Sequence, residues 1–202
     1  MKPRIEQKLK DNIGRVRNMV KIYDDHLKGS GSGRRGHLQT DVLRAATVFL
    51  HASLEDLLRS LSYWKLPLAD RETIDKVPIV GSNGSSPKKF LLGELVEHRN
   101  KKIDELIKES VDEYLERSNY NNTGEIAALM PAIGVQVKNI SAEFKILEEL
   151  MARRHQIVHR ADIDESGGAG NHKVKSIGVT QVHKWIESVE SFGITLLDEF
   201  DE

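Results

Sequence analysis

The chain has 202 residues, of which 39% are hydrophobic, 30% are charged and 5% are aromatic, and its formal net charge is −1. Because this charge is nearly neutral, the chain has no global basic field that would indicate nucleic-acid binding, and any anion-binding site must be local. The absence of cysteine excludes disulfides, thiolate zinc sites and cysteine nucleophiles, and it fits a reducing compartment. With so few aromatic residues, leucine, isoleucine and valine must form the core, which favours amphipathic helices over a sandwich or barrel.

The amino terminus carries no recognisable targeting signal. Its first residues, MKPRIEQKLKDN, lack the apolar stretch of a signal peptide, and no run in the chain approaches the ~18 apolar residues of a membrane span. The sequence therefore predicts a soluble, cytoplasmic protein that does not enter a membrane.

Apolar residues at helical spacing predict two helices in the first third of the chain. The first runs from about Pro3 to Leu27, and the second, from about His37 to Trp64, is the most hydrophobic and is expected to lie at the centre of the core. The glycine- and serine-rich stretch Gly29–Gly36 between them is interpreted as a flexible connector. A phosphate-binding loop is the alternative, but the stretch matches no P-loop or dinucleotide-binding spacing.

The remaining predicted helices are separated by loops. The stretch Lys65–Pro87 contains three prolines and is predicted to be a long loop with a short turn at Asp70–Lys76. Further helices are predicted at Phe90–Arg117, Glu125–Ile133, Ser141–Ala161 and Gln181–Phe200, and a flexible loop at Asp162–Gly170.

Together these elements predict one all-α domain over residues 1–202, a helical bundle of about four or five principal helices with long loops. Residues 1–36 would supply an N-terminal helix and the Gly/Ser linker, and residues 37–202 would form the core. The N-terminal helix either belongs to the domain or decorates it.

The stretch Glu148–Arg160 places a cation where a core residue is expected. On a helical wheel, Arg154 falls near the middle of an apolar arc, and His159 lies roughly 140° away from it. A guanidinium keeps its proton, and burying one without partners costs several kcal/mol. Either the arc is not simply core, or an anionic group meets Arg154 there. Such a conflict between pattern and burial is typical of a functional site.

Residues 154–159 read RHQIVH, which is an arginine, a polar residue, three further residues and a histidine. In an all-α chain this resembles the HEPN superfamily, whose ribonuclease members carry an Arg-x4–6-His motif on a late helix. The segment Leu54–Arg59 resembles the acidic helix that packs beside the motif helix in that family, and Glu125–Gly134 resembles the segment before the motif in members from bacterial defence and toxin systems. The position after the motif arginine is most often asparagine in the family, whereas here it is His155.

The resemblance implies a homodimer in which the two motif helices face each other, and a metal-independent endoribonuclease without a cofactor. In this reaction the ribose 2′-OH attacks the adjacent phosphorus and leaves a 2′,3′-cyclic phosphate. The substrate would be RNA, and the protein would be a toxin or antiviral defence effector with an antitoxin-like or defence-system partner.

The residue types suit that chemistry. Histidine transfers protons near neutral pH, so His159 is predicted to do the acid/base work. A guanidinium grips phosphate oxygens through paired N–H groups, so Arg154 is predicted to bind the scissile phosphate. His155 would be a second proton carrier or would orient the substrate. Arg153 and Arg160 are predicted to contact phosphates of the RNA backbone. Glu55 is predicted to hold Arg154 in place.

Three alternatives remain open. His155 and His159, four residues apart, could ligate zinc, although no third ligand is obvious and no metal is predicted. Arg154 could instead form a purely structural buried bridge with Glu55 or Asp56. Finally, the chain could be a non-catalytic HEPN-like module that binds RNA or a protein partner, or that dimerises, which the near-neutral charge favours.

Overall fold

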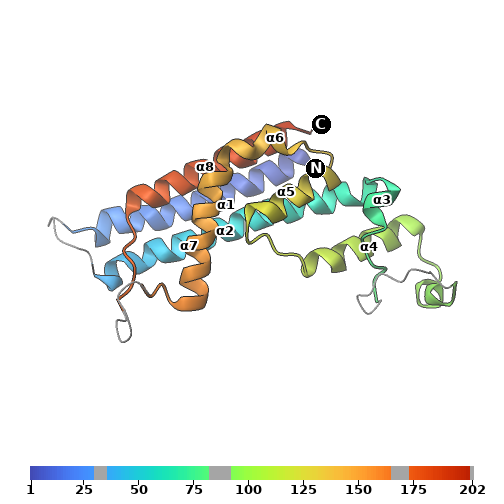
Figure 1. Ribbon diagram of the computed structural model, residues 1–202, viewed down its shortest axis with the longest axis horizontal. Coiled ribbons are helices and arrows are strands. Elements are labelled where there is room, and N and C mark those ends of the chain that lie inside the picture. The colour runs from blue at the N-terminus through green and yellow to red at the C-terminus, as the bar shows by residue number, and fades with distance from the viewer. Residues whose placement is uncertain (30–35, 82–91, 165–172, 201–202) are drawn as a thin grey trace.

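A bundle of three long helices forms the centre of the molecule. The computed structural model describes residues 1–29, 36–81, 92–164 and 173–200. Helices α1 (Lys2–Ile22), α2 (His37–Lys65) and α8 (Val179–Asp198) run side by side along its long axis, and α7 (Phe144–Arg160) crosses them (Figure 1). Apolar residues at three- and four-residue spacing explain this arrangement, since they give each helix one buried face.

Helix α1 belongs to this core. Its buried residues recur on one face: Ile5, Leu9, Ile13, Val16 and Val20. They meet the leucine-rich face of α2, and a π-helical turn, Tyr23–Leu27, continues α1. The predicted helices near Pro3–Leu27 and His37–Trp64 are therefore confirmed. The predicted connector Gly29–Gly36 lies mostly outside the described residues.

The single helix predicted at Phe90–Arg117 is wrong. The structure has a 3-10 helix at Leu92–His98 and then α4 (Ile103–Glu116), while Phe90 itself lies outside the described residues. Asn100 separates them with a left-handed φ of 71°, a conformation that asparagine tolerates better than most residues. Helix α4 begins where the Glu105 carboxylate accepts the Lys102 N–H at 3.1 Å.

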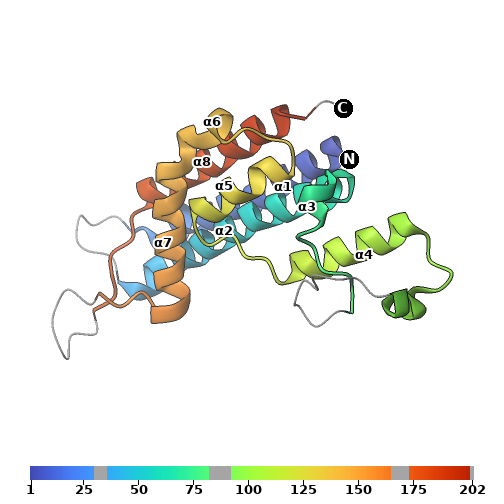
Figure 2. The ribbon, with the colours of Figure 1, turned by 45° about the vertical axis from the view of Figure 1, so that its right-hand side comes forward.

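The described residues 66–81, within the long loop predicted at Lys65–Pro87, form only short helical turns, as predicted. A 3-10 turn, Leu66–Leu68, leads to the single-turn helix α3 (Arg71–Ile74), which confirms the turn expected at Asp70–Lys76. The Asp70 carboxylate caps α3 by accepting the Thr73 N–H at 2.8 Å. Figures 1 and 2 both show α4 extending away from the bundle beside the end of α2. The later part of this loop, residues 82–87, lies outside the described residues.

Helix α5 (Thr123–Ala132) starts where the Asn122 side chain accepts the Glu125 N–H at 2.9 Å. Between it and α7 lie the short helix α6 (Val137–Ile140) and a 3-10 turn, Ser141–Glu143, so the motif helix begins slightly later than predicted. Part of the predicted flexible loop Asp162–Gly170 lies outside the described residues.

The all-α fold class is confirmed. Five helices in the described part of the chain have 14 residues or more: α1, α2, α4, α7 and α8. The described residues contain no strand, and their one β-type pairing is an isolated bridge between Ile163 and Val174. None of the described helices combines the length and the apolar character that crossing a membrane requires.

The contact of α8 with α1 and α2 depends on Gly193. A Cβ atom there would clash with the Leu9 side chain and would approach Leu57 Cδ2 to 3.1 Å. We predict that Gly193→Ala lowers the free energy of unfolding by about 1–3 kcal/mol, because the helices must separate or the leucines must leave their rotamers. Urea denaturation measures this change.

Gly14 provides the matched control, since a Cβ added there meets nothing within 4 Å. Gly14→Ala should stabilise the protein by up to ~1 kcal/mol, through helix propensity alone. Equal effects of the two substitutions would contradict the close packing of α8.

Candidate functional site

The carboxyl-terminal half of α7 carries the motif and leaves the bundle. The buried residues of the whole helix are Leu147, Leu150, Met151 and Arg153. Beyond them the apolar arc comes out into solvent, where Val158 is 46% exposed, and Figure 1 shows this end of α7 extending past α2. Of the two alternatives for the apolar arc, the structure agrees with the first, that the arc is not simply core: Arg154 is half-buried on it, whereas Arg153 is buried.

Arg153 is buried beside a buried carboxylate, with which it forms an ion pair. Asp162, just beyond the end of α7, is fully buried, and its Oδ2 accepts a hydrogen bond from Arg153 Nη2 at 2.8 Å. The same oxygen accepts from Nε of Arg44, on α2, at 2.7 Å. We call these three residues the Asp162 cluster. Removing ions from water is costly, and here that cost is offset by short, charge-assisted hydrogen bonds.

The Asp162 cluster ties three segments together. Arg44 Nη2 and Arg153 Nη2 both donate to the carbonyl oxygen of Lys175, at 2.7 and 3.0 Å, so the chain before α8 is held against α2 and α7. The backbone of Ala161 and Asp162 is left-handed, with φ of 48° and 58°. This reversal ends α7 and turns the Asp162 side chain back into the protein.

The electrostatics of Arg153 follow from this burial. Desolvation lowers the pKa of its guanidinium, and the nearby charge of Arg44 lowers it further, while Asp162 opposes both effects. Only 8% of Arg153 is exposed, and its Nη2 is engaged by Asp162 and by two carbonyl oxygens. This placement argues against the predicted contact of Arg153 with an RNA backbone, because its guanidinium is already bonded to Asp162 and to the chain before α8.

Arg154 has a different environment. Its Nη1 donates a long hydrogen bond of 3.3 Å to the side-chain oxygen of Asn121, a neutral partner. Its Nε is buried, and no hydrogen bond to it is found within the described part of the chain. None of the carboxylates described lies within ion-pair distance of it. Arg154 is thus a partly buried cation that no acidic side chain in the described part of the chain neutralises directly.

The two acids predicted as partners of Arg154 lie elsewhere. Asp56 pairs with Lys8 of α1 at 2.6 Å. Glu55 lies 3.7 Å from Nδ1 of His51, and its other oxygen is 3.5 Å from the Tyr120 N–H. The alternative of a structural bridge from Arg154 to either acid is therefore wrong. The predicted support from Glu55 is indirect at most, through the Tyr120 segment.

That segment, residues 119–123, is held on both sides and is called the Asn121 loop. From α2, the buried His51 donates from Nε2 to the Tyr120 carbonyl oxygen over 3.1 Å. From α7, the Glu148 carboxylate accepts the backbone N–H and the hydroxyl of Thr123, at 3.0 and 2.8 Å. These contacts fix the loop that presents Asn121 to Arg154.

His51 was not singled out by the sequence pattern. Burial lowers the pKa of its imidazole, and although Glu55 opposes this effect, the charge of Arg154 adds to it. A neutral His51 supports the Asn121 loop without adding a second positive charge beside Arg154. The signal that could have identified it is a histidine four residues before a glutamate, on a helix whose neighbouring positions are leucines.

His155 and His159 lie together on the outer surface of α7. Both are exposed, and their ring centroids are 4.6 Å apart with the planes tilted by 45°. Among the described residues, neither ring forms a hydrogen bond or ring contact with Arg154, so one chain brings the two histidines together but not the histidines and the arginine. Arg160, the last residue of α7, is also exposed.

The zinc alternative finds no support in this geometry. A structural or catalytic zinc site needs three or four protein ligands. Among the residues that the structure describes, no group of three or more histidine, cysteine, aspartate or glutamate side chains is arranged to hold a metal ion. The neighbouring imidazoles are instead two solvent-accessible groups capable of proton transfer.

The Asp162 cluster makes a direct prediction about stability. Asp162→Asn leaves the buried guanidinium of Arg153 without its anionic partner and that of Arg44 with only the exposed Asp41. It should lower the free energy of unfolding by about 3–5 kcal/mol. Asp41→Asn is the control, since Asp41 also contacts Arg44, at 3.2 Å, but its side chain is 63% exposed. It should cost less than about 1 kcal/mol. Similar urea denaturation midpoints for the two variants would contradict the structural role of Asp162.

Comparison with known proteins agrees with this architecture. The sequence model of the family described as RiboL-PSP-HEPN matches residues 10–202, which include most of α1 and the whole of the site described above. No curated protein and no solved structure shows significant similarity to the chain. The predicted resemblance to the HEPN superfamily is confirmed, and the chain belongs to the RiboL-PSP-HEPN family.

Proposed function

We propose that the protein is a metal-independent endoribonuclease that cuts RNA by attack of the 2′-OH. The observation that carries this proposal is the environment of the Arg154 guanidinium. It is a partly buried guanidinium with a neutral hydrogen-bond partner, and two imidazoles follow on the same helix. Membership in a HEPN family supports the reaction class.

In this reaction the O2′–P bond forms and the P–O5′ bond breaks. A base takes the proton from the 2′-OH, and an acid gives a proton to the leaving 5′-oxygen, so that a 2′,3′-cyclic phosphate and a 5′-hydroxyl remain. We assign this proton transfer to His159, with His155 as the second carrier. Arg154 would stabilise the charge on the pentacoordinate phosphorus, where a desolvated cation is most effective. Arg160 is proposed to contact a flanking phosphate.

A homodimer completes the proposed site. Arg154 faces the Asn121 loop, whereas His155 and His159 face solvent on another side of the same helix. A second chain packed against the exposed end of α7 would bring its histidines to the first chain's arginine. Val158, which is 46% exposed between the two histidines and Arg154 on the helix surface, supplies an apolar contact for that packing.

The biological role and the partner are proposed from membership in the HEPN family. We propose a toxin or defence effector acting on cytoplasmic RNA, with a restraining protein partner and without a cofactor. The second candidate is a non-catalytic module that binds RNA or protein. The observation that favours it is charge: the net charge is −1, and α4 reads IDELIKESVDEYLE, with six acids and one lysine.

The test is cleavage of a structured RNA by the purified protein in EDTA. We expect cleavage with 2′,3′-cyclic phosphate ends, and a loss of about 100-fold or more in rate for Arg154→Ala and for His159→Ala. Arg71→Ala and His183→Ala are matched controls on exposed residues of α3 and α8, and they should cut at the wild-type rate.

Three results would overturn parts of the proposal. Loss of cleavage in EDTA would refute the metal-independent mechanism, and unchanged cleavage by Arg154→Ala or His159→Ala would refute the assigned site. RNA that is bound but never cut by the wild-type protein would favour the non-catalytic module.

A further inference from the structure

A pocket opens on the other side of the Asn121 loop from α7. Its volume is about 450 Å³, within the usual range for small-molecule sites. The Asn121 loop, the last turn of α4, the exposed side of α5 and the segment around α3 form its walls. Asn121, which accepts the hydrogen bond from Arg154, also lines this pocket. The pocket is therefore one side chain away from the guanidinium.

The lining of this pocket combines an aromatic ring with neutral polar groups. Tyr114 is 41% exposed, and the side chains of Asn119 and Asn121 offer amide donors and acceptors. Leu129 and Ala132 supply an apolar surface. A flat ring with hydrogen-bonding edges matches this lining, since it can stack on the phenol ring and pair with the amides.

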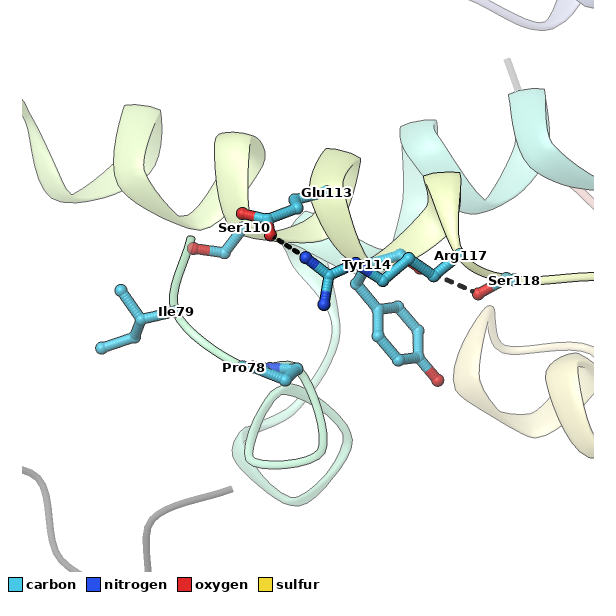
Figure 3. A pocket seen from close by; sticks show the side chains of 7 residues that line it. All are labelled: Pro78, Ile79, Ser110, Glu113, Tyr114, Arg117 and Ser118. Carbon is cyan, nitrogen blue, oxygen red and sulfur yellow. Dashed lines mark hydrogen bonds and ion pairs between the residues drawn. The ribbon is translucent and has the colours of Figure 1, made fainter. Parts of the chain in front are cut away.

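Tyr114 stands between this pocket and a second cavity. The second cavity, of about 340 Å³, also has Tyr114 and Ser118 in its lining (Figure 3). In Figure 3 the charged residues of that cavity, Glu113 and Arg117, are joined to each other, and the Tyr114 ring, which is 41% exposed, extends from α4. The ring is thus available as a stacking surface.

The charges indicate a base and not a phosphate as the occupant. The charged side chains that line the pocket among the described residues are one lysine, Lys76, and one glutamate, Glu125, whose carboxylate accepts the Asn121 N–H. The neighbouring helix α4 is acidic. A phosphate would be repelled along α4, whereas a neutral base would not.

We propose that this pocket receives an unpaired nucleobase of an RNA strand whose phosphate lies at Arg154. The inference rests on the proposed function in taking Arg154 as the phosphate ligand. The Asn121 loop then serves both groups: its Asn121 amide lies against the guanidinium on one side and borders the base pocket on the other. Because His51 and Glu148 hold this loop in place, the pocket is formed before the substrate binds.

The test measures binding, so that it does not depend on cleavage. A fluorescein-labelled, single-stranded 2′-O-methyl oligoribonucleotide cannot be cut by 2′-OH attack, and its affinity for the wild-type protein follows from fluorescence anisotropy. Tyr114→Ala should weaken binding about tenfold, in line with the loss of one base–aromatic stacking contact. Tyr114→Phe keeps the ring and should bind like the wild type.

Two controls separate the pocket from general effects. Tyr63→Ala removes a tyrosine that is 52% exposed on α2 and lies outside the pocket lining, and it should leave the affinity unchanged. An oligomer with the same sugar-phosphate backbone but without bases should bind equally to wild-type protein and Tyr114→Ala.

Equal affinity of Tyr114→Ala and Tyr63→Ala for the base-containing strand would overturn the base pocket, as would a wild-type protein that does not bind this strand. If Tyr114→Ala weakens binding while the wild-type protein fails to cut RNA, the pocket stands and the nuclease proposal falls. If Arg154→Ala abolishes cleavage while Tyr114→Ala leaves binding unchanged, the nuclease stands without the pocket.

Discussion

One buried carboxylate, Asp162, determines how the motif helix is placed. Two guanidinium groups from different helices share its Oδ2, and both also donate to the Lys175 carbonyl oxygen. A buried ion group of this kind is costly to assemble and more costly to leave incomplete, so α7 has little freedom to rotate about its axis. The rotation that buries Arg153 is the rotation that turns Arg154, one residue later, toward the Asn121 loop.

The two adjacent arginines have different partners, and this difference accounts for the arrangement of the candidate site. Arg153 is paired with Asp162 inside the protein, whereas among the described residues Arg154 donates only to the amide of Asn121, so its charge is available to an anion. The same rotation leaves His155 and His159 on the solvent side of α7. An arginine and a pair of histidines that face different directions in one chain are the physical reason for proposing a site completed by a second chain.

Periodicity was sufficient to predict α1, α2 and α8, because their buried residues recur every three or four positions. It did not predict the break at Asn100, since the flanking charged residues suit a helix equally well. It also placed Arg153 outside the buried face, because a helical wheel assigns burial by apolar neighbours and cannot include Asp162, which lies past the end of the helix. The contacts of His51 and Asn121 join residues 69 and 33 positions apart, a separation that no local pattern reports.

If two chains together supply Arg154 and the histidines, as we propose, mixing two inactive variants tests this arrangement most directly. Arg154→Ala and His159→Ala protein are unfolded together in urea and refolded as a mixture, so that mixed dimers form. If each site takes its arginine from one chain and His159 from the other, a two-fold dimer has one intact site in every mixed pair, and about a quarter of wild-type RNA cleavage should return. A mixture as inactive as either variant alone, with mixed dimers demonstrated, would contradict the shared site.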